Sequence, residues 1–515
     1  MNNNPLVPKY KFYVDGLFTG YSEISWGCFA YTIGHKKIIS LPENFNLDSH
    51  IEQYPPEDYG FTKKFNKDKI IYFLGLFASI PARNSDLIDD SGFIPIHMGK
   101  IRNEIKDIKL YVDYLINTGV VICNTHYEPG VRSRGYKWND IYENKPFQAK
   151  LTDCRYADIV HEYEQSPDIK NYPYLFHWYE QRKLLIDRKV ERYAFDIKEK
   201  KMQDTTQESW DKNDKGKYKY PVLQYKAAIC NIGKIQHQRF EAHIDTNIHR
   251  LHSTLTNLQS DLKNFITYDN NKLVSIDIKN CQPYMSCLIF HKEFWEKDSP
   301  LPLNLYNLPD NIQYRMHTPS ILPIMIGRLL AESKDDDFSE YINLVSTGVI
   351  YEEMIKVAKE SIGEIITRAE AKKLIFYILF SSNQDDQGNQ GHHDDSKINQ
   401  MRKIFSQLFP KVNELYRLIK TEFEDVELEK QHNRLSCLLQ SIESKIVLHR
   451  ICKRIWEEGN QQIPIFTIHD SVVTTVENKD YVKDVMIEEL TNCIGVKPTL
   501  KDEYWDKTNI TGCYT

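Results

Sequence analysis

Near its C-terminal end the chain carries an apolar, β-branched run that a single charged dipeptide interrupts. Residues 463–468 read Ile-Pro-Ile-Phe-Thr-Ile, His469 and Asp470 follow, and an apolar run resumes at 471–473. This pattern predicts two strands joined by a tight turn that presents a carboxylate. Burying that charge is costly unless it binds a cation, so the turn indicates a metal or a cationic substrate. For this stretch alone, an Asp that only caps a turn remains the alternative.

A second stretch has the same form. Residues 273–278 are a strand-like apolar run that carries Asp277 near its end, and an apolar, helix-like run follows at 285–290. Two strand-end carboxylates far apart in the sequence are what a two-metal phosphoryl-transfer site requires, because each helps to hold a pair of divalent ions. Hard cations with oxygen ligands indicate Mg²⁺ or Mn²⁺ rather than zinc.

Between these stretches, four residues follow one another at steps of four: Arg368, Lys372, Phe376 and Phe380. Residues four apart share a helix face, so one face offers two cations and then two aromatic rings. Such a face can clamp a triphosphate and stack a base, whereas an ordinary amphipathic helix would carry aliphatic residues there. Along the chain, the stretch with Asp277, the stretch from Arg368 to Phe380 and the stretch with His469-Asp470 resemble, in turn, motifs A, B and C of the family A nucleic-acid polymerases. That group contains bacterial DNA polymerase I and, more distantly, the single-subunit phage RNA polymerases.

Three further segments resemble this family in the same order. Residues 250–259 resemble its Arg-Leu…Asn-Leu-Gln segment, residues 404–412 its Phe…Tyr-Pro-x-Val element, and residues 439–445 its Gln-bearing helix before motif C. The resemblance therefore covers about the C-terminal half of the chain. The polar side chains that it assigns to nucleic-acid binding are Arg250, Asn257, Gln259, Gln440 and His469.

The resemblance implies an α+β fold, a right-hand polymerase with palm, fingers and thumb. It places a helical, charged, thumb-like region at 146–245 and a palm at 246–515, with fingers inserted at about 340–425. Residues 293–337, rich in Pro and Asn, are expected to be an insertion. Residues 381–400, rich in Gln, Asn, Asp, Gly and His, are expected to be a mobile loop.

The N-terminal region, residues 1–145, differs from the rest of the chain in its pattern of predicted elements. Its predicted elements are a helix over 101–115 and strands at 120–123 and 135–138. Helix, strand, basic turn and strand are the layout of a winged helix, so we expect an N-terminal α+β, winged-helix-like domain. Its Arg132 and Arg134 can contact phosphate near the wing tip. A small structural α+β domain is the alternative.

Composition bears on compartment and partners. A chain of 515 residues can hold two or three domains, and it has no apolar run long enough to span a bilayer. Its first residues lack the layout of a signal peptide, and its ten scattered cysteines include no Cys-x-x-Cys, which favours reduced thiols and a cytoplasmic location.

The net charge of −6 does not favour nucleic-acid binding, but what matters is where the cations lie. Residues 212–239 carry seven Lys and Arg with interleaved Tyr, either a nucleic-acid surface or a solvated face.

In the mechanism that the resemblance implies, a primer 3′-hydroxyl attacks the α-phosphate of an incoming nucleotide and pyrophosphate leaves. Asp277 and Asp470, with the backbone carbonyl of Ile278, would hold two Mg²⁺ (or Mn²⁺) ions. Lys372 would also act catalytically, because it is placed to protonate the pyrophosphate.

The resemblance also assigns the nucleotide contacts. Arg368 and Lys372 would bind the triphosphate, Phe376 would pack on the sugar and base, and Phe380 would line the nascent base pair. His469 would orient the primer end, with a structural role in the turn as the alternative.

Two departures from the family concern the choice of sugar. Gln282 stands where the DNA polymerases carry a Glu that blocks a ribose 2′-hydroxyl and where the RNA polymerases carry a small residue. Gln keeps the bulk without the charge, so we expect a preference for deoxyribose with weaker rejection of ribose. Phe380-Ser381 replaces the usual Tyr-Gly, and the lost hydroxyl removes a hydrogen bond.

The leading prediction is a template-directed DNA polymerase that serves DNA replication, for example of a mobile element, phage or plasmid. Its partners would be primer–template DNA and nucleoside triphosphates, without a membrane. No Asp-x-Glu, which proofreading exonucleases of this family carry, precedes residue 245, so no exonuclease is expected. The alternatives are an RNA polymerase or primase-like enzyme, and a DNA-binding replication initiator with a degenerate polymerase core. Retention of Asp277, Asp470, Arg368 and Lys372 argues against the last.

Overall fold

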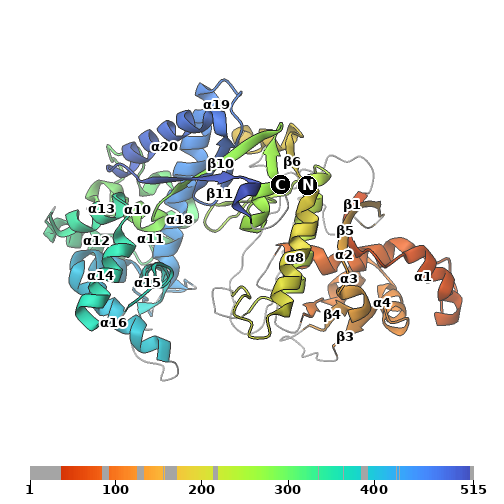
Figure 1. Ribbon diagram of the computed structural model, residues 1–515. Helices are drawn as coiled ribbons and strands as arrows, with labels where there is room; N and C mark the ends of the chain where they lie inside the picture. Colours follow the sequence, from red (N-terminus) through yellow and green to blue (C-terminus); the bar gives the residue numbers. More distant parts are fainter. Residues whose placement is uncertain are drawn as a thin grey trace, which may run out of the picture. The chain divides into compact units, whose positions relative to one another are not determined.

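The chain mixes helices and strands and divides into two compact units (Figure 1). Unit 1 comprises Met1–His243, His252–Lys272 and Trp505–Thr515, and unit 2 comprises Ile244–Leu251 and Leu273–Tyr504. The computed structural model describes residues 36–83, 92–124, 133–154, 156, 171–212, 218–334, 336–363, 365–383, 393–424, 426–428 and 430–510.

In unit 1, two helices pack on a two-stranded antiparallel sheet. β1 (Lys36–Pro42) pairs with β5 (Phe147–Asp153), and α2 (Lys67–Arg83) and α9 (Pro221–Gln236) contact both each other and this pair. The core between them is aromatic, because almost fully buried rings meet edge to face. These rings belong to Phe73, Phe77, Trp138 and Phe147.

A second small sheet of unit 1 contains the predicted strands of the N-terminal region. β3 (Val121–Cys123) and β4 (Gly135–Trp138) confirm the two expected strands, and β4 also pairs with β2 (Ile94–Pro95). The prediction of one continuous helix over 101–115 is wrong, because the structure has two helices there, α3 (Met98–Glu104) and α4 (Ile108–Asn117). The break has a physical reason: Asp107 has a φ of 60°, which a continuous right-handed helix cannot contain. Arg132 lies outside the described residues, and the winged-helix assignment stays a prediction.

The segment expected to be a helical thumb-like region also contains strands. Its helices α7 (Pro173–Glu180) and α8 (Lys189–Gln203) are separated by β6 (Leu184–Ile186), which corrects the expectation of helix there. β6 pairs with β9 (Ile266–Tyr268), so a partner distant in the sequence outweighs the local helical pattern. The other elements of this unit are α1 (Leu47–Gln53) and α5 (Asp140–Glu143), and β7 (Ala242–Ile244) pairs with β8 (Leu251–Ser253).

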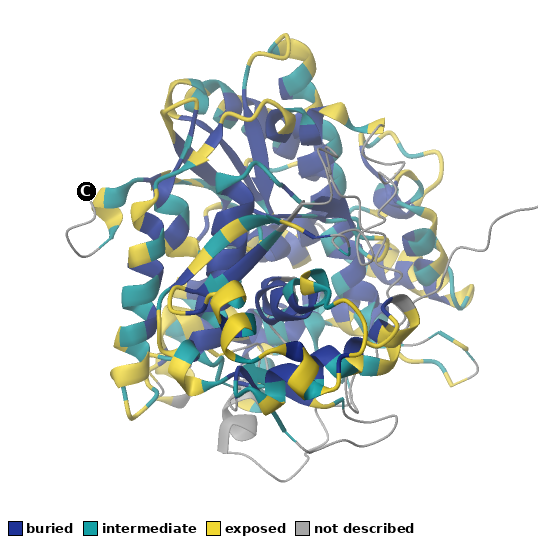
Figure 2. Ribbon diagram, turned by 90° about the vertical axis from the view of Figure 1, so that its right-hand side faces the viewer, coloured by how far each residue is buried: buried dark blue, intermediate teal, exposed yellow. Residues whose placement is uncertain are grey.

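Unit 2 is built on an antiparallel hairpin. β11 (Ile465–Ile468) pairs with β12 (Ser471–Thr475), β12 pairs with β10 (Asn271–Ile278), and β13 (Leu500–Trp505) pairs with β10. Every residue of β11 and β12 is buried, in keeping with the dark interior strands of Figure 2. The hairpin at 463–473 and the strand ending near Asp277 are therefore confirmed.

Helices surround this hairpin. α10 (Cys281–Ser286) contacts α18 (Arg434–Ile446), and α20 (Lys479–Ile494) contacts β12, α18 and α19 (Cys452–Glu458). The expected helix at 285–290 starts earlier, as α10, and continues as a 3₁₀ turn at Cys287–Phe290. The remaining helices are α11 (Asp310–Met316), α12 (Ile321–Glu332), α13 (Asp336–Ser346), α14 (Ile350–Ile362), α15 (Arg368–Phe380), α16 (His393–Leu408) and α17 (Pro410–Ile419).

The mobile loop expected at 381–400 is wrong over its second part, because α16 already begins at His393. Further along this helix, Ile404 and Phe405 are buried, and α16 contacts α14, α15 and α17. An apolar helix face that finds such partners overrides the polar composition at its start. Residues 384–392 lie outside the described part of the chain.

A buried hydroxyl cluster fixes α10 in unit 2. The hydroxyl of Tyr416 lies 2.6 Å from Ser286 Oγ and 2.9 Å from the Tyr341 hydroxyl, which joins α10, α13 and α17. Within the ranges described, no helix is long and apolar enough to cross a membrane.

Candidate active site

The two strand-end carboxylates come from neighbouring strands of unit 2. Asp277 of β10 is the register partner of Ser471 of β12, and Asp470 directly precedes Ser471 in the turn from β11. Ser471 Oγ donates a hydrogen bond of 2.8 Å to Asp277 Oδ1. His469 opens the turn with a φ of 54° and an exposed side chain. A tight hairpin therefore brings one predicted carboxylate beside the strand that carries the other.

The Asp470 carboxyl lies in a poorly hydrated and negatively charged environment. Burial of the carboxyl, followed by the charges of Glu443 and Asp277, raises its pKa from 3.8 to about 7, and Arg250 acts in the opposite direction. A cation near this carboxyl would stabilise its ionised form and so lower its pKa again. Strongly shifted groups of this kind are typical of functional sites.

The chemistry of these donors fits a hard divalent cation. Carboxylate oxygens are the ligands that Mg²⁺ and Mn²⁺ prefer, and Mg²⁺ is usually bound by one or two carboxylates plus phosphates and water. Among the residues that the structure describes, no three His, Cys, Asp or Glu side chains are grouped as a metal site. The roles of Asp277, Asp470 and the Ile278 carbonyl as metal ligands all stay predictions.

Glu443 on α18 is a central residue that our sequence analysis missed. Its side chain is 1% exposed, and Oε2 accepts hydrogen bonds from Arg250 Nη2 at 2.6 Å and from Gln282 Nε2. Cys281 Sγ lies 3.5 Å from the same oxygen. The signal that points to this residue is a lone acid on the buried face of α18, three positions after Gln440. Arg250 was predicted to bind nucleic acid, and Gln282 was predicted to govern the choice of sugar. The two side chains both donate to one carboxylate oxygen of Glu443.

The helix predicted over 368–380 is confirmed as α15, and its first turn carries a capping box between Thr367 and Glu370. Three of the four residues spaced at steps of four, Lys372, Phe376 and Phe380, follow one another in contact along it. Lys372 Nζ lies 5.6 Å from the centre of the Phe376 ring, and the Phe376 and Phe380 rings are 5.3 Å apart. Lys372 is exposed and both rings are only partly buried, so this face is accessible.

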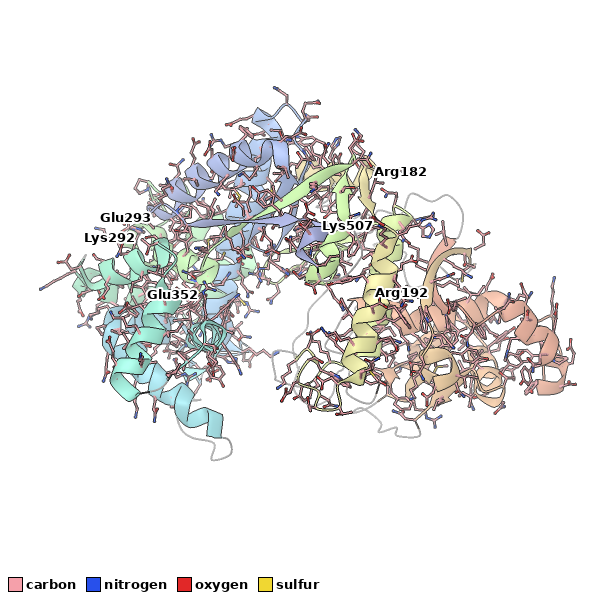
Figure 3. The ribbon with its side chains drawn as sticks, viewed as in Figure 1. Arg182, Arg192, Lys292, Glu293, Glu352 and Lys507 are labelled. Atoms are coloured by element: carbon pink, nitrogen blue, oxygen red, sulfur yellow. The ribbon has the colours of Figure 1, made fainter. Side chains whose placement is uncertain are left out.

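Arg368, at the start of α15, is held by α14. Its Nε donates to Glu352 Oε1 at 2.8 Å, and its guanidinium lies 5.1 Å from the centre of the Tyr351 ring (Glu352 is labelled in Figure 3). Burial raises the pKa of the Tyr351 hydroxyl, Arg368 lowers it, and the charge of Asp470 adds to the rise. The charges of both Arg368, on α15, and Asp470 therefore act on Tyr351.

The other residues predicted to bind nucleic acid are placed as follows. Asn257 and Gln259 belong to unit 1, where the Asn257 carbonyl accepts from Asn231 and the Gln259 amide donates to the Gln224 carbonyl. Gln440 is half-buried on α18. Contact of any of them with nucleic acid stays a prediction.

No protein-family model matches the sequence, and no curated protein matches it. Among solved structures, a similar one is the POL domain of Pol1 from M. smegmatis in complex with DNA primer-template and dNTP. The similarity covers 64% of this chain and 67% of that chain, at 12% sequence identity and a TM-score of 0.33. What indicates a function for this chain is therefore the set of residues in the site itself.

Proposed function

We propose that this chain is a template-directed nucleotidyltransferase, a DNA polymerase that uses two Mg²⁺ or Mn²⁺ ions. The observation that carries the proposal is the position of Asp277 on β10 and of Asp470 in the turn that leads into the adjacent β12, with Ser471 Oγ 2.8 Å from Asp277 Oδ1. The raised pKa of Asp470, about 7 through burial and the nearby acids, supports a cation at the same place. Divalent ions bound there would lower the pKa of the primer 3′-hydroxyl and neutralise charge on the leaving pyrophosphate.

Side chains of the protein would bind the nucleotide and donate the proton. Lys372 and Arg368 bind the triphosphate, and the exposed Lys372 ammonium can donate a proton to the departing pyrophosphate. Phe376 and Phe380 offer partly buried rings for the sugar and the base. In this proposal α14–α17 belong to the fingers, the hairpin and α18–α20 belong to the palm, and the partners are primer–template DNA and nucleoside triphosphates.

An RNA polymerase or primase-like enzyme is the second candidate, and Gln282 favours it. This residue occupies the position proposed to exclude ribose, but it carries no charge there. Its amide is also engaged with Glu443. A neutral side chain rejects a hydroxyl less strongly than a charged one would, so the choice of sugar must be measured.

Primer extension tests the proposal. The purified protein is given dNTPs or rNTPs on DNA and RNA templates with Mg²⁺, beside Asp277→Asn and Asp470→Asn. We expect incorporation by the unmodified protein and at least a 10³-fold loss in either variant, roughly the scale on which catalytic electrostatics act. Asp502→Asn is the matched control, because Asp502 lies on the adjoining β13 and pairs with Lys483 at 2.7 Å. Substantial extension by both active-site variants would sink the assignment.

A further inference from the structure

Lys445 is a half-buried cation of unit 2 without an acidic partner. It lies near the end of α18, and among the residues that the structure describes its ammonium has no hydrogen-bond or ion-pair partner. The Lys and Arg residues that follow on the same helical run each pair with an acid: Arg450 with Glu489 at 2.9 Å, Lys453 with Glu457 at 3.7 Å and Arg454 with Glu458 at 2.8 Å. Lysines are seldom buried unless they are paired, so Lys445 is unusual.

The end of α18 does not explain this lysine. A cation near a helix C-terminus is stabilised by the negative end of the helix dipole, but this helix does not end at Ile446. A π-helical turn at Val447–Ile451 joins α18 directly to α19, and the N–H of Cys452 donates to the carbonyl of Val447, five residues back. The charge of a free helix end is therefore missing beside Lys445.

The π-helical turn also sets which side chains lie above Lys445. Its hydrogen bonds close over five residues instead of four, so Arg450 follows Lys445 along one face of the run. Burial lowers the pKa of the Lys445 ammonium, and the charges of Arg450 and Lys453 lower it further. Cations thus line this face from Lys445 to Lys453, over about 12 Å of the helix axis.

A turn of the same unit adds a histidine to this face. Ser444 Oγ donates to the Ile248 carbonyl at 3.3 Å, which holds the turn with His249 against α18. Burial, followed by the charges of Lys445 and His249, lowers the pKa of His449 from 6.5 to about 4. These three side chains therefore disfavour one another's positive charge, and a bound anion would relieve that repulsion.

We propose that Lys445 and its neighbours bind the phosphate backbone of a nucleic-acid strand. Lysine binds phosphate as a compact point charge, and an anion beside Lys445 would compensate for the water that burial removes. A single phosphate cannot contact both Lys445 and Lys453, whose side chain is 52% exposed. A strand carries one charge for about every 3.4 Å of its axis, so it can contact both.

The position of this surface favours a nucleic acid over an acidic protein. His249 is next to Arg250, which pairs with Glu443 at 2.6 Å, and the charge of Glu443 acts on Asp470. The surface is therefore joined to the candidate active site through one turn and one helix. The choice of nucleic acid rests on the proposed function, whereas the unpaired cation does not.

A lysine whose stem covers apolar surface while its ammonium stays in water is the competing explanation. Such a lysine contributes to packing, so its replacement would lower Tm and leave nucleic-acid binding unchanged. A cation that its neighbours repel behaves in the opposite way. Its replacement raises Tm of the free protein and weakens binding.

The test is binding of a fluorescent oligonucleotide to the full chain, measured by anisotropy in EDTA at several salt concentrations. EDTA removes divalent ions, so the result does not depend on metal at Asp277 and Asp470. Lys445→Gln should raise Kd about fivefold, whatever the base sequence, because one phosphate contact is lost. The slope of log Kd against log salt should fall by about 0.9 on a duplex and by about 0.7 on a single strand. Tm without nucleic acid should rise.

Lys483→Gln is the matched control. It removes the same charge from unit 2, but Lys483 lies on α20 and pairs with Asp502 at 2.7 Å, so Kd should stay within about twofold. An unchanged Kd in Lys445→Gln, or equal changes in the two variants, would overturn the inference. If Lys445→Gln does not fold, the exposed Lys453→Gln is measured in its place, and an unchanged Kd there is equally fatal.

Competition identifies the source of the anion. Polyglutamate should displace the oligonucleotide far less well than unlabelled DNA does, and equal displacement would assign the surface to an acidic protein. Affinity for dATP should be the same in Lys445→Gln as in the unmodified protein. A loss of dATP binding without a change in oligonucleotide binding would assign the surface to a free nucleotide, and either outcome would overturn the inference.

The two proposals fail in different ways. Oligonucleotide binding that Lys445→Gln weakens, without incorporation of any nucleotide, would keep this surface and remove the polymerase. Incorporation that Asp277→Asn abolishes, together with an unchanged Kd in Lys445→Gln, would do the reverse.

Discussion

Ser471 and Asp277 are joined by a 2.8 Å hydrogen bond although they are 194 positions apart in the sequence. The bond exists because the two residues are register partners on β12 and β10. It holds one oxygen of Asp277 in place, so a serine next to Asp470 helps to orient the carboxylate that we propose as a metal ligand.

Ser471→Ala removes this bond and should slow incorporation about tenfold, because a mobile carboxylate binds a metal less well. The defect should shrink at high Mg²⁺, which a titration of the incorporation rate would reveal. Ser275→Ala is the control, since Ser275 is a buried serine on β10 two residues before Asp277. Equal defects in both variants would show that the hydrogen bond is not responsible.

Lys372→Ala should lower kcat by roughly 10²–10³, the cost of losing one charge-assisted contact in a transition state. Affinity for primer–template, measured by fluorescence anisotropy, should change little, because Lys372 is proposed to touch only the triphosphate. The adjacent exposed Lys373, replaced by Ala, serves as control. Normal turnover with poor DNA affinity would instead place Lys372 on the duplex.

Glu352→Gln frees Arg368 from its ion pair and should lower KM for the nucleotide about two- to threefold. The expected change is small because both side chains are about half exposed, at 53% and 49%, and such exposed pairs contribute roughly 1 kcal/mol or less. Glu353→Gln on the same helix, which breaks the exposed pair with Lys356, is the matched control. A raised KM would mean that Glu352 positions Arg368 for the nucleotide rather than restraining it.

Asp470 should make the metal-free protein less stable as the pH rises. Burial and the neighbouring acids raise its pKa from 3.8 to about 7, so the folded state favours the protonated form. The resulting stabilisation is complete below about pH 4 and is lost as the pH rises through 7. Asp470→Asn should therefore raise Tm at pH 8 more than at pH 5, and Mg²⁺ should stabilise the unmodified protein more at pH 8. Thermal unfolding in EDTA and in Mg²⁺ would check both, and a pH-independent difference would contradict the shift.

Unit 1 contains a buried ion pair between Lys226 of α9 and Glu143 of α5, whose side chains are 0% and 4% exposed. Burial lowers the pKa of the Lys226 ammonium, and Glu143 opposes this. Glu143→Gln leaves that ammonium without its counter-charge and should cost about 3–5 kcal/mol in urea unfolding. Asp48→Asn, which breaks the exposed pair with Lys67, should cost little. Similar losses would argue against a special role for the buried pair.

The sequence determined the local elements of the candidate site. Apolar, β-branched runs predicted the strand that carries Asp277 and the strand that precedes His469, and the four-residue spacing from Arg368 to Phe380 predicted α15. Such patterns are readable because they depend on neighbours two to four positions apart. Such patterns fail where contacts with distant residues determine the secondary structure of a segment. One example is β6, which pairs with β9. Another is α16, where the helix with buried Ile404 and Phe405 begins within a polar stretch.

Only the tertiary structure decided which side chains meet. Strand register places Ser471 on Asp277, and helix packing brings Glu443 to Arg250 and Gln282 and Glu352 to Arg368. None of these pairings follows from spacing, because each joins segments whose separation is set by packing rather than by a helical or strand period. The chemistry of Asp277 and Asp470 could be anticipated from their positions at strand ends. For Glu443 the sequence offers only a lone acid in a helical segment, and the contacts of its carboxylate with Arg250 and Gln282 come from the tertiary structure.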